Sequence, residues 1–452
     1  MKLRWKNGLI LIFLFLGIVL LIWGLPRLLS ILFKNKESVS NSSKIIEFLN
    51  SAEASLKKGD IIAAVESARD VLSLDNRNRE SLRILGSIPT APWPTFKGNL
   101  RRDGLSKYIG PKLPYLKWHF KCESFGERYS LVAQDNFIYF YSTRGLFCLN
   151  DKGEKLWSYD FESSAIKPAF TLDIDGTIFL VPVDPKNPCF LGRLLRFDKH
   201  SNNLENYPIE IKNIAGNAYP RMEIVPTITK AGNKYLNLTN PPCFAVLSHN
   251  GSLKEVIKDL DAAGIAAVSD DRMVILHGSD GTESKVYSIG LDNNIKWCKT
   301  ISKSSGISNP AIGKDGTIYV VCNHKLHAIS QEGSFKWQWG KEKDLGLSPV
   351  LASDGTIYIC SFPNYIHAIG VDGVEKWELQ LDKAVGAPSP LIDANGTIYV
   401  SCGKVYAINS DGTMKWEYTT EDTCRSNPSM DSNGTLYIFD SEYLYAIGEK
   451  KQ

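Results

Sequence analysis

Residues 308–337, SNPAIGKDGTIYVVCNHKLHAISQEGSFKW, decide the fold of this 452-residue chain. The stretch holds a Pro, an Asp-Gly turn, two strand-like segments, a second Gly turn and a closing Lys-Trp. The same order recurs along the chain, so that Trp297, Trp337, Trp377 and Trp416 stand 40, 40 and 39 residues apart. A repeat of this length built from short strands is typical of a β-propeller, because one small sheet buries its faces only by stacking on its neighbours.

The spacing inside each copy is as regular as the period. A Pro stands six residues before the Gly of the first turn in four copies, at Pro310, Pro349, Pro390 and Pro428. Segments such as residues 317–320 follow these turns and are rich in β-branched and aromatic residues, which favours strands. Each copy therefore predicts a blade of four antiparallel strands.

The last copy is incomplete, because only residues 448–452 follow its third strand. Residues 115–120 have the pattern of a fourth strand, including Trp118, but no three strands of their own before them. We expect this N-terminal strand to close the last blade, which removes exposed sheet edges.

The blade number follows from counting fourth strands. Six carry a tryptophan, and two degenerate ones are expected near residues 207–211 and 254–257, within blades interrupted around residues 183–191 and 233–242. The sequence therefore predicts an all-β, eight-bladed propeller. Seven blades with one long excursion is the alternative count.

The region before the propeller has a different character. Residues 7–26 hold no charged side chain, and 20 such residues match a hydrocarbon core of about 30 Å. We predict a transmembrane signal anchor in residues 1–37, with a signal peptide cleaved near residues 38–40 as the alternative. Lys2, Arg4 and Lys6 favour a cytoplasmic N-terminus and a periplasmic or extracellular propeller, although the positive charges beyond residue 26 leave the opposite topology open.

Residues 38–90 predict a polar linker and a short α-helical hairpin. Residues 38–43 are polar, and apolar or small residues then recur at helical spacing in residues 45–56 and 63–72. The pattern resembles one tetratricopeptide unit, too few for a peptide groove, so we interpret it as a spacer or a dimer contact. The domain limits predicted here are 1–37, 38–90 and 91–452.

Composition excludes one class of partner and gives little support to disulfides. A net charge of +3, with basic and acidic residues interspersed, offers no basic stripe for nucleic acid. The nine cysteines are odd in number, and Cys322, Cys360 and Cys402 recur at nearly one place in successive copies, as small buried residues do. Cys189 and Cys243, both in interrupted blades, are the pair that best fits a disulfide.

The histidines and turn aspartates need no metal. His327 and His367 stand where other copies carry a tyrosine, so we interpret both as packing residues. Residues 173–176 come nearest to a calcium loop, but a hairpin turn explains them better. The repeated tryptophans are interpreted as contacts between blades. We predict no catalytic, cofactor-binding or metal-binding residue.

The Asp-Gly-Thr-Ile-Tyr, Tyr-Ala-Ile and Lys-Trp segments together resemble the pyrroloquinoline-quinone-like (PQQ-like) repeat, whose members form eight-bladed propellers. The match is clearest over residues 308–447, and residues 93–106 resemble the segment that leads into the first blade in this family. Its quinone dehydrogenases hold the cofactor over the ring axis between a Trp and a vicinal disulfide. This chain has no adjacent cysteines, so the departure argues against that enzyme class.

The chain is also similar to the propeller lipoprotein of the outer-membrane β-barrel assembly machinery, although it lacks the lipid-bearing cysteine of that protein. This resemblance implies a membrane-anchored, non-catalytic scaffold for protein–protein interaction in the cell envelope. The alternatives are a sensor ectodomain for a polysaccharide or small ligand and, less favoured, a quinone-dependent dehydrogenase. We expect a protein partner, membrane attachment through the N-terminal helix, and no cofactor.

Overall fold

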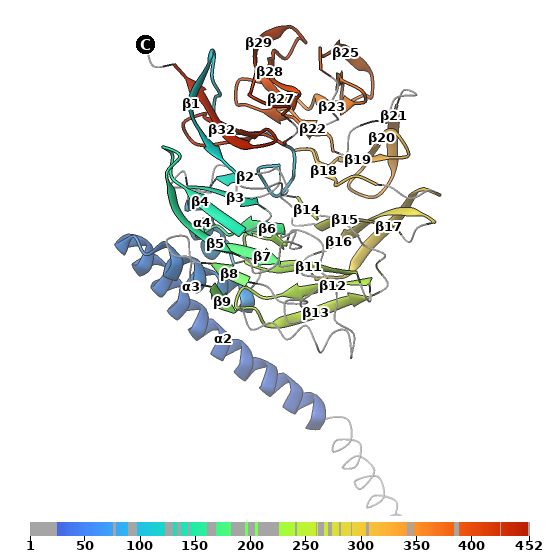
Figure 1. Cartoon of the computed structure of the whole chain (residues 1–452). Helices are drawn as coiled ribbons and strands as arrows, with labels where there is room; N and C mark the ends of the chain where they lie inside the picture. Colours follow the sequence, from blue (N-terminus) through green and yellow to red (C-terminus); the bar gives the residue numbers. More distant parts are fainter. Residues whose placement is uncertain are drawn as a thin grey trace, which may run out of the picture. The chain divides into compact units, whose positions relative to one another are not determined.

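The computed structural model describes residues 25–75, 78–88, 97–122, 130–132, 137–142, 145–160, 169–181, 195–197, 204–206, 226–239, 242–258, 260, 266–269, 274–279, 282–290, 292–303, 307–340, 345, 348–383, 388–424 and 426–450. The chain forms two compact units, Met1–Ile88 and Pro89–Gln452. The first is helical and the second consists of antiparallel sheets (Figure 1).

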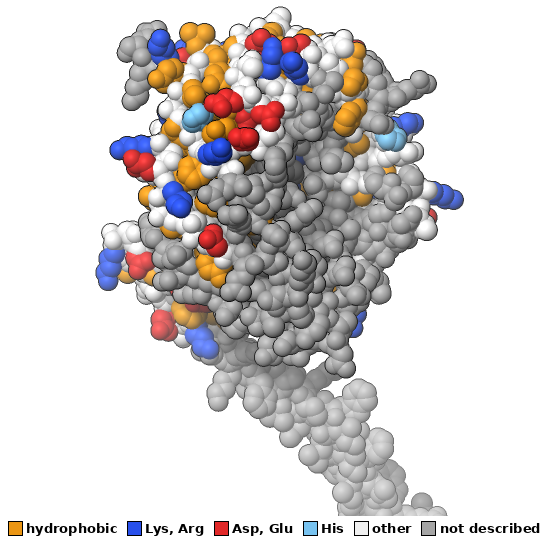
Figure 2. Space-filling view, viewed as in Figure 1, with side chains coloured by type: hydrophobic (Ala, Val, Ile, Leu, Met, Phe, Trp, Pro, Cys, Tyr) orange, Lys and Arg blue, Asp and Glu red, His pale blue; other side chains and the backbone are white. Residues whose placement is uncertain are grey.

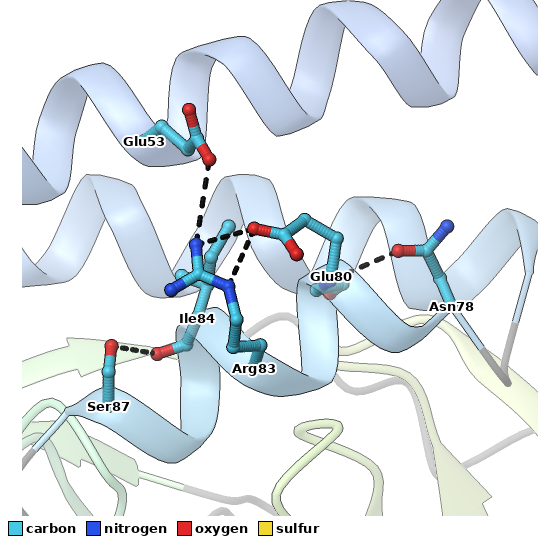
Figure 3. Close-up of polar contacts among 7 residues, drawn as sticks. Glu53, Asn78, Glu80, Arg83, Ile84 and Ser87 are labelled. Carbon is cyan, nitrogen blue, oxygen red and sulfur yellow. Dashed lines mark hydrogen bonds and ion pairs between the residues drawn. The ribbon is translucent and has the colours of Figure 1, made fainter.

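Three described helices pack together in the first unit: α2 (Leu25–Lys58), α3 (Ile61–Leu74) and α4 (Arg79–Ser87). The side chain of Asp60 accepts from Ala63 N at the start of α3, and that of Asn78 accepts from Ser81 N at the start of α4, as N-cap residues do. Arg83 on α4 contacts both Glu80 and Glu53, so it links α4 to α2 (Figure 3).

The fold-class prediction is wrong in what it places before the propeller. Residues 38–43 are not a linker but part of α2, a helix of 34 residues, and the expected helices at residues 45–56 and 63–72 lie in α2 and α3, which α4 follows. Within the described residues, none of the helices combines the length and apolarity needed to cross a membrane. The predicted span at residues 7–26 lies outside the described residues except for its last two.

The second unit contains eight described four-stranded sheets. Seven are built from four consecutive strands, and the eighth joins β1 to β30–β32. Seven, the alternative count, is thus the number of blades that are continuous in sequence.

Four sheets lie in the first half of this unit and at its closure. Their strands are β2 (Ser130–Val132), β3 (Ile138–Ser142), β4 (Gly145–Leu149) and β5 (Lys155–Asp160); β6 (Ala169–Leu172), β7 (Ile178–Val181), β8 (Leu195–Phe197) and β9 (Leu204–Asn206); β10 (Thr227–Ile228), β11 (Lys234–Thr239), β12 (Pro242–Leu247) and β13 (Leu253–Lys258); and β1 (Pro114–Lys121) with β30 (Ser429–Met430), β31 (Leu436–Phe439) and β32 (Tyr443–Glu449).

The other four sheets contain the most regular repeats. Their strands are β14 (Ala267–Val268), β15 (Val274–Ser279), β16 (Ser284–Ile289) and β17 (Ile295–Ser302); β18 (Ala311–Ile312), β19 (Ile318–Cys322), β20 (Lys325–Ile329) and β21 (Phe335–Trp339); β22 (Val350–Leu351), β23 (Ile357–Ser361), β24 (Tyr365–Ile369) and β25 (Glu375–Gln380); and β26 (Leu391–Ile392), β27 (Ile398–Cys402), β28 (Lys404–Ile408) and β29 (Met414–Tyr418).

The predicted closing strand is confirmed. β1 pairs antiparallel with β32, with Trp118 opposite Ala446. One expected interruption is wrong, because residues 233–242 contain β11, which pairs with β12 throughout its length. The other interruption, at residues 183–191, and the fourth strand expected at residues 207–211 lie outside the described residues.

The sheets follow one another around a ring, joined by apolar side chains. Buried clusters link each sheet to the next from β10–β13 to β26–β29, and a larger one joins β26–β29, the closing sheet and β2–β5. A further cluster joins β2–β5 to β6–β9, and Lys234 of β11 lies 4.7 Å above the ring of Phe179 on β7. These contacts complete the circle, so the core is distributed over the seams between sheets.

Residues 97–111, which we call the strap, run along the first strands of several sheets, the strands nearest the ring centre (Figure 1). Backbone carbonyls of the strap accept from the first strands of four consecutive sheets, namely at Val268, Ile312, Leu351 and Ile392. The buried side chains of Lys97 and Arg102 add bonds to Pro349 O (2.7 Å) and Ala266 O (2.7 Å). The strap therefore ties four consecutive sheets to a segment that is far from them in sequence.

Candidate functional site

Each regular blade is fastened to the next by its tryptophan. The indole Nε1 of Trp297 donates to Gln331 O at 2.8 Å, and that of Trp337 donates to Val371 O at 2.8 Å, both in the last turn of the following blade. Trp377 and Trp118 make the corresponding bonds to Ser410 O and Asp151 O, and Trp416 donates instead to Pro111 O, shortly before the closing strand β1. The interpretation of the tryptophans as contacts between blades is confirmed.

The Gly of each last turn makes room for that indole. Gly333 has φ +86°, and a Cβ there would lie 2.8 Å from Cδ2 of Trp297. The same close approach occurs at Gly373, Gly412 and Gly153. The Gly of one copy and the Trp of the copy before it therefore form a joint between two successive blades. The indole of Trp157 is the exception, since its buried Nε1 has no hydrogen-bond partner among the described residues.

One position of the fourth strand presents apolar side chains to solvent on several blades. Leu253, Ile295, Phe335 and Met414 each begin a fourth strand directly after the last turn, and their exposed fractions are 46%, 41%, 47% and 42%. We call these four residues the apolar arc. They belong to four of five consecutive sheets, and the sheet between Phe335 and Met414 carries Glu375 at this position.

The surroundings of the apolar arc are charged but mixed. In three of the regular blades the Lys before the Trp bonds a Thr of the first turn, as Lys336 Nζ does with Thr317 Oγ1 at 2.9 Å. Lys299 lies 4.8 Å from the Phe335 ring. On the described part of one face, apolar side chains lie between charges of both signs (Figure 2). A surface of this kind suits a protein partner better than a polyanion.

The two predicted packing histidines differ in their environment. His327 is buried against Phe335, with ring centroids 6.0 Å apart, and burial lowers the pKa of its imidazole. His367 also packs, 5.1 Å from the Trp339 ring, but its ring nitrogens contact Ser361, Glu375 and Glu378. The sequence interpretation missed these two carboxylates.

The recurring cysteines are small buried residues, as predicted. Cys322, Cys360 and Cys402 are at most 3% exposed and form no disulfide among the described residues, and burial raises the pKa of the Cys322 thiol. Cys243 forms no disulfide with another described cysteine, and Cys189, its predicted partner, lies outside the described residues. Asp173, in the loop compared with a calcium site, accepts from Ile174 N and forms a turn in which Gly176 N donates to Asp173 O.

Comparison with known proteins supports the fold. The sequence matches no known family description and no curated protein. Among solved structures, BamB from Moraxella catarrhalis is 13% identical with a TM-score of 0.50, covering 74% of this chain and 100% of its own. The quinohemoprotein alcohol dehydrogenase ADHIIG from Pseudomonas putida HK5 is 10% identical with a TM-score of 0.60, covering 81% of each chain. The resemblance to PQQ-like propellers is thereby confirmed at the level of fold.

The residues of this chain do not fit the quinone site that the resemblance to quinone dehydrogenases implies. The family resemblance implies a cofactor held between a Trp and two bonded, adjacent cysteines. No two cysteines are adjacent here, and the eight described ones form no disulfide with one another. Moreover, the first strands of four sheets bond to the strap at the ring centre. We derive no reaction through this cofactor.

Proposed function

We propose that this propeller is a non-catalytic scaffold that binds a protein partner in the cell envelope through the apolar arc. The observation that supports the proposal most strongly is the recurrence of exposed apolar side chains at one position of successive blades. Single exposed apolar residues are common on protein surfaces, but contiguous groups of them mark interaction sites. The arc of Leu253, Ile295, Phe335 and Met414 repeats an exposed apolar side chain at one strand position on four of five consecutive sheets.

Rigidity of the ring is the second support. The strap crosses four sheets, the indoles fasten successive blades, and β1 closes the circle. A partner that binds such a surface does so with little loss of conformational entropy in the scaffold, which favours affinity. The fold similarity to BamB is consistent with this role without identifying a partner.

Site-specific photocrosslinking tests the proposal. A photoreactive amino acid placed at Phe335 or Met414 in native cells is expected to give a discrete crosslinked protein. Phe362 provides the matched control: it is 51% exposed but lies in the turn between β23 and β24, at the opposite end of a blade. Equal crosslinking from Phe362, or none from the apolar arc, would refute the assignment of this surface.

The location is a separate part of the proposal. We propose that the propeller lies in the periplasm or at the cell exterior, supported by the uncharged run at residues 7–26. Protease added to intact cells, or to cells with a permeabilised outer membrane, is expected to digest the propeller while a cytoplasmic marker survives. Survival of both proteins until the inner membrane is lysed would place the propeller in the cytoplasm.

A further inference from the structure

One histidine and two glutamates converge on the sheet β22–β25. His367 on β24 has Nδ1 2.8 Å from Glu375 Oε1 and 3.4 Å from Glu378 Oε2, both on β25. One ligand atom from each residue lies within 4.8 Å of the others. The side chain of His367 is completely buried, whereas those of Glu375 and Glu378 are 21% and 31% exposed. The cluster is therefore anchored in the protein interior by the His367 side chain, and solvent reaches it on the side of the two carboxylates.

The second ring nitrogen of His367 is also fixed. Its Nε2 lies 2.8 Å from Ser361 Oγ on the adjacent strand β23. Histidines that bind metals in proteins hold their other nitrogen in a hydrogen bond of this kind, which sets the orientation of the ring and the tautomer. With Nε2 on the serine hydroxyl, Nδ1 faces two carboxylates. A lone pair beside two negative groups is repulsive, so a proton or a metal cation has to stand between them.

The repeats act as an internal control for this arrangement. The residue pair that corresponds to His367 and Glu375 on the other regular sheets is an aromatic and an apolar residue, as at Tyr406 and Met414. On the preceding sheet the pair is His327 and Phe335, which gives the same histidine no carboxylate at this position. The blade fold is thus satisfied without charge at the Glu375 position, although Glu417 takes the place of Glu378 opposite Tyr406. Among the described residues, only the β22–β25 sheet combines an imidazole with two acids in this way.

We propose that His367 Nδ1, Glu375 and Glu378 bind a divalent transition-metal ion, and that Zn²⁺ is the best match. Imidazole nitrogen and carboxylate oxygen together suit zinc, which commonly takes three protein ligands and leaves a position for water or another ligand. The ion takes the place of the proton at Nδ1, so binding releases a proton whenever His367 is protonated beforehand. The inference does not depend on the proposed scaffold function.

Isothermal titration of ZnCl₂ into the full chain, after treatment with a chelator and dialysis, tests the proposal. We expect one equivalent to bind with a micromolar or lower dissociation constant. Glu378→Gln keeps the size of the side chain and removes its charge, and we expect it to weaken binding by about tenfold or more. His367→Tyr installs the residue that other copies carry and is expected to abolish binding. His327→Tyr, the same change on the neighbouring sheet, is the matched control and should bind zinc normally.

Cobalt substitution separates this site from the cysteines. Co²⁺ bound by His367, Glu375 and Glu378 gives visible bands without the intense absorption of a thiolate-to-cobalt transition. Zinc binding that survives His367→Tyr, a thiolate-type cobalt spectrum, or no binding at all would overturn the proposal, and in the last case the cluster is a proton-bound ion pair. If His367→Tyr fails to fold, Glu378→Gln decides between these results alone.

Discussion

Replacement of Arg102 by methionine tests whether the strap stabilises the ring. The Arg102 side chain is completely buried, its Nε donates to Ala266 O at 2.7 Å and its Nη2 lies 3.4 Å from Thr227 Oγ1. These two acceptors belong to different sheets or to the segments that lead into them. Methionine has a similar length and the same cost at the left-handed φ of 55°, so the substitution removes the polar bonds with little change in backbone strain.

The size of the effect follows from these contacts. A hydrogen bond from a charged donor contributes about 1.5–3 kcal/mol, and without the guanidinium Ala266 O keeps only the longer bond from Thr227 Oγ1, at 3.3 Å. Relief from burying the guanidinium charge offsets part of this loss. We therefore expect a loss of about 3 kcal/mol in the free energy of unfolding. For a domain this large, 1 kcal/mol shifts the melting temperature by at most about 2 °C, so the midpoint falls by about 5 °C.

Differential scanning calorimetry on the full chain measures the shift, and Lys112→Met is the control because Lys112 is an exposed residue directly after the strap. Hydrogen exchange adds a local readout, since β10 and β14 should lose protection before the distant sheets do. A melting temperature for Arg102→Met equal to that of Lys112→Met would refute the argument that the strap stabilises the ring through its buried cation.

Three further predictions concern the strap, the interblade joints and the closure. Burial lowers the pKa of Lys97, so between the lowered and the ordinary pKa the unfolded chain binds more protons than the folded one. The free energy of unfolding therefore rises with pH across that window. Urea melts should show that Lys97→Met flattens this rise. Thermal melts should show a larger loss of stability for Gly333→Ala than for Gly396→Ala. Both substitutions cost about 1–2 kcal/mol at positive φ, but only the Cβ added at residue 333 meets an indole, 2.8 Å away. Removal of residues 1–121 takes away β1 and the strap and should leave an aggregating protein by light scattering, whereas a chain beginning at Pro89 should stay monodisperse.

The repeated blades were accessible from sequence because their signals are local. Asp315 and Gly316 show why: the Asp315 side chain accepts from Thr317 N at 3.0 Å and Gly316 supplies φ +79°, so the turn is set by neighbouring residues. The closing strand was also predictable, since an incomplete last copy and an isolated fourth strand imply one another. For the blades the signal lies within one repeat, and for the closing strand it lies in the strand that the last repeat lacks.

The strap and α2 were less accessible. The contact of Lys97 with Pro349 joins residues 252 apart in sequence, and nothing in residues 97–111 specifies which strands they meet. The polar residues 38–43 suggested a linker, yet no Gly or Pro interrupts residues 27–58, and α2 ends where Gly59 supplies φ +78°. Polar side chains alone do not break a helix, because their propensities differ by only tenths of a kcal/mol per residue.

The metal-binding cluster could not be predicted from strand periodicity, because a β-bulge changes which residues of β25 share a face. Glu375 and Glu378 are three residues apart, and strict alternation would place them on opposite faces of β25. The register shifts between Ala368 and Ile369, so that Lys376 is left over, Glu375 pairs with Ile369 and Glu378 pairs with His367. Both glutamates therefore reach the face that carries His367. The same bulge occurs on neighbouring sheets, where it places Phe335 and Met414 in the apolar arc. One backbone feature thus serves either chemistry, and the residue that follows the last turn decides whether a blade presents an apolar contact or a ligand.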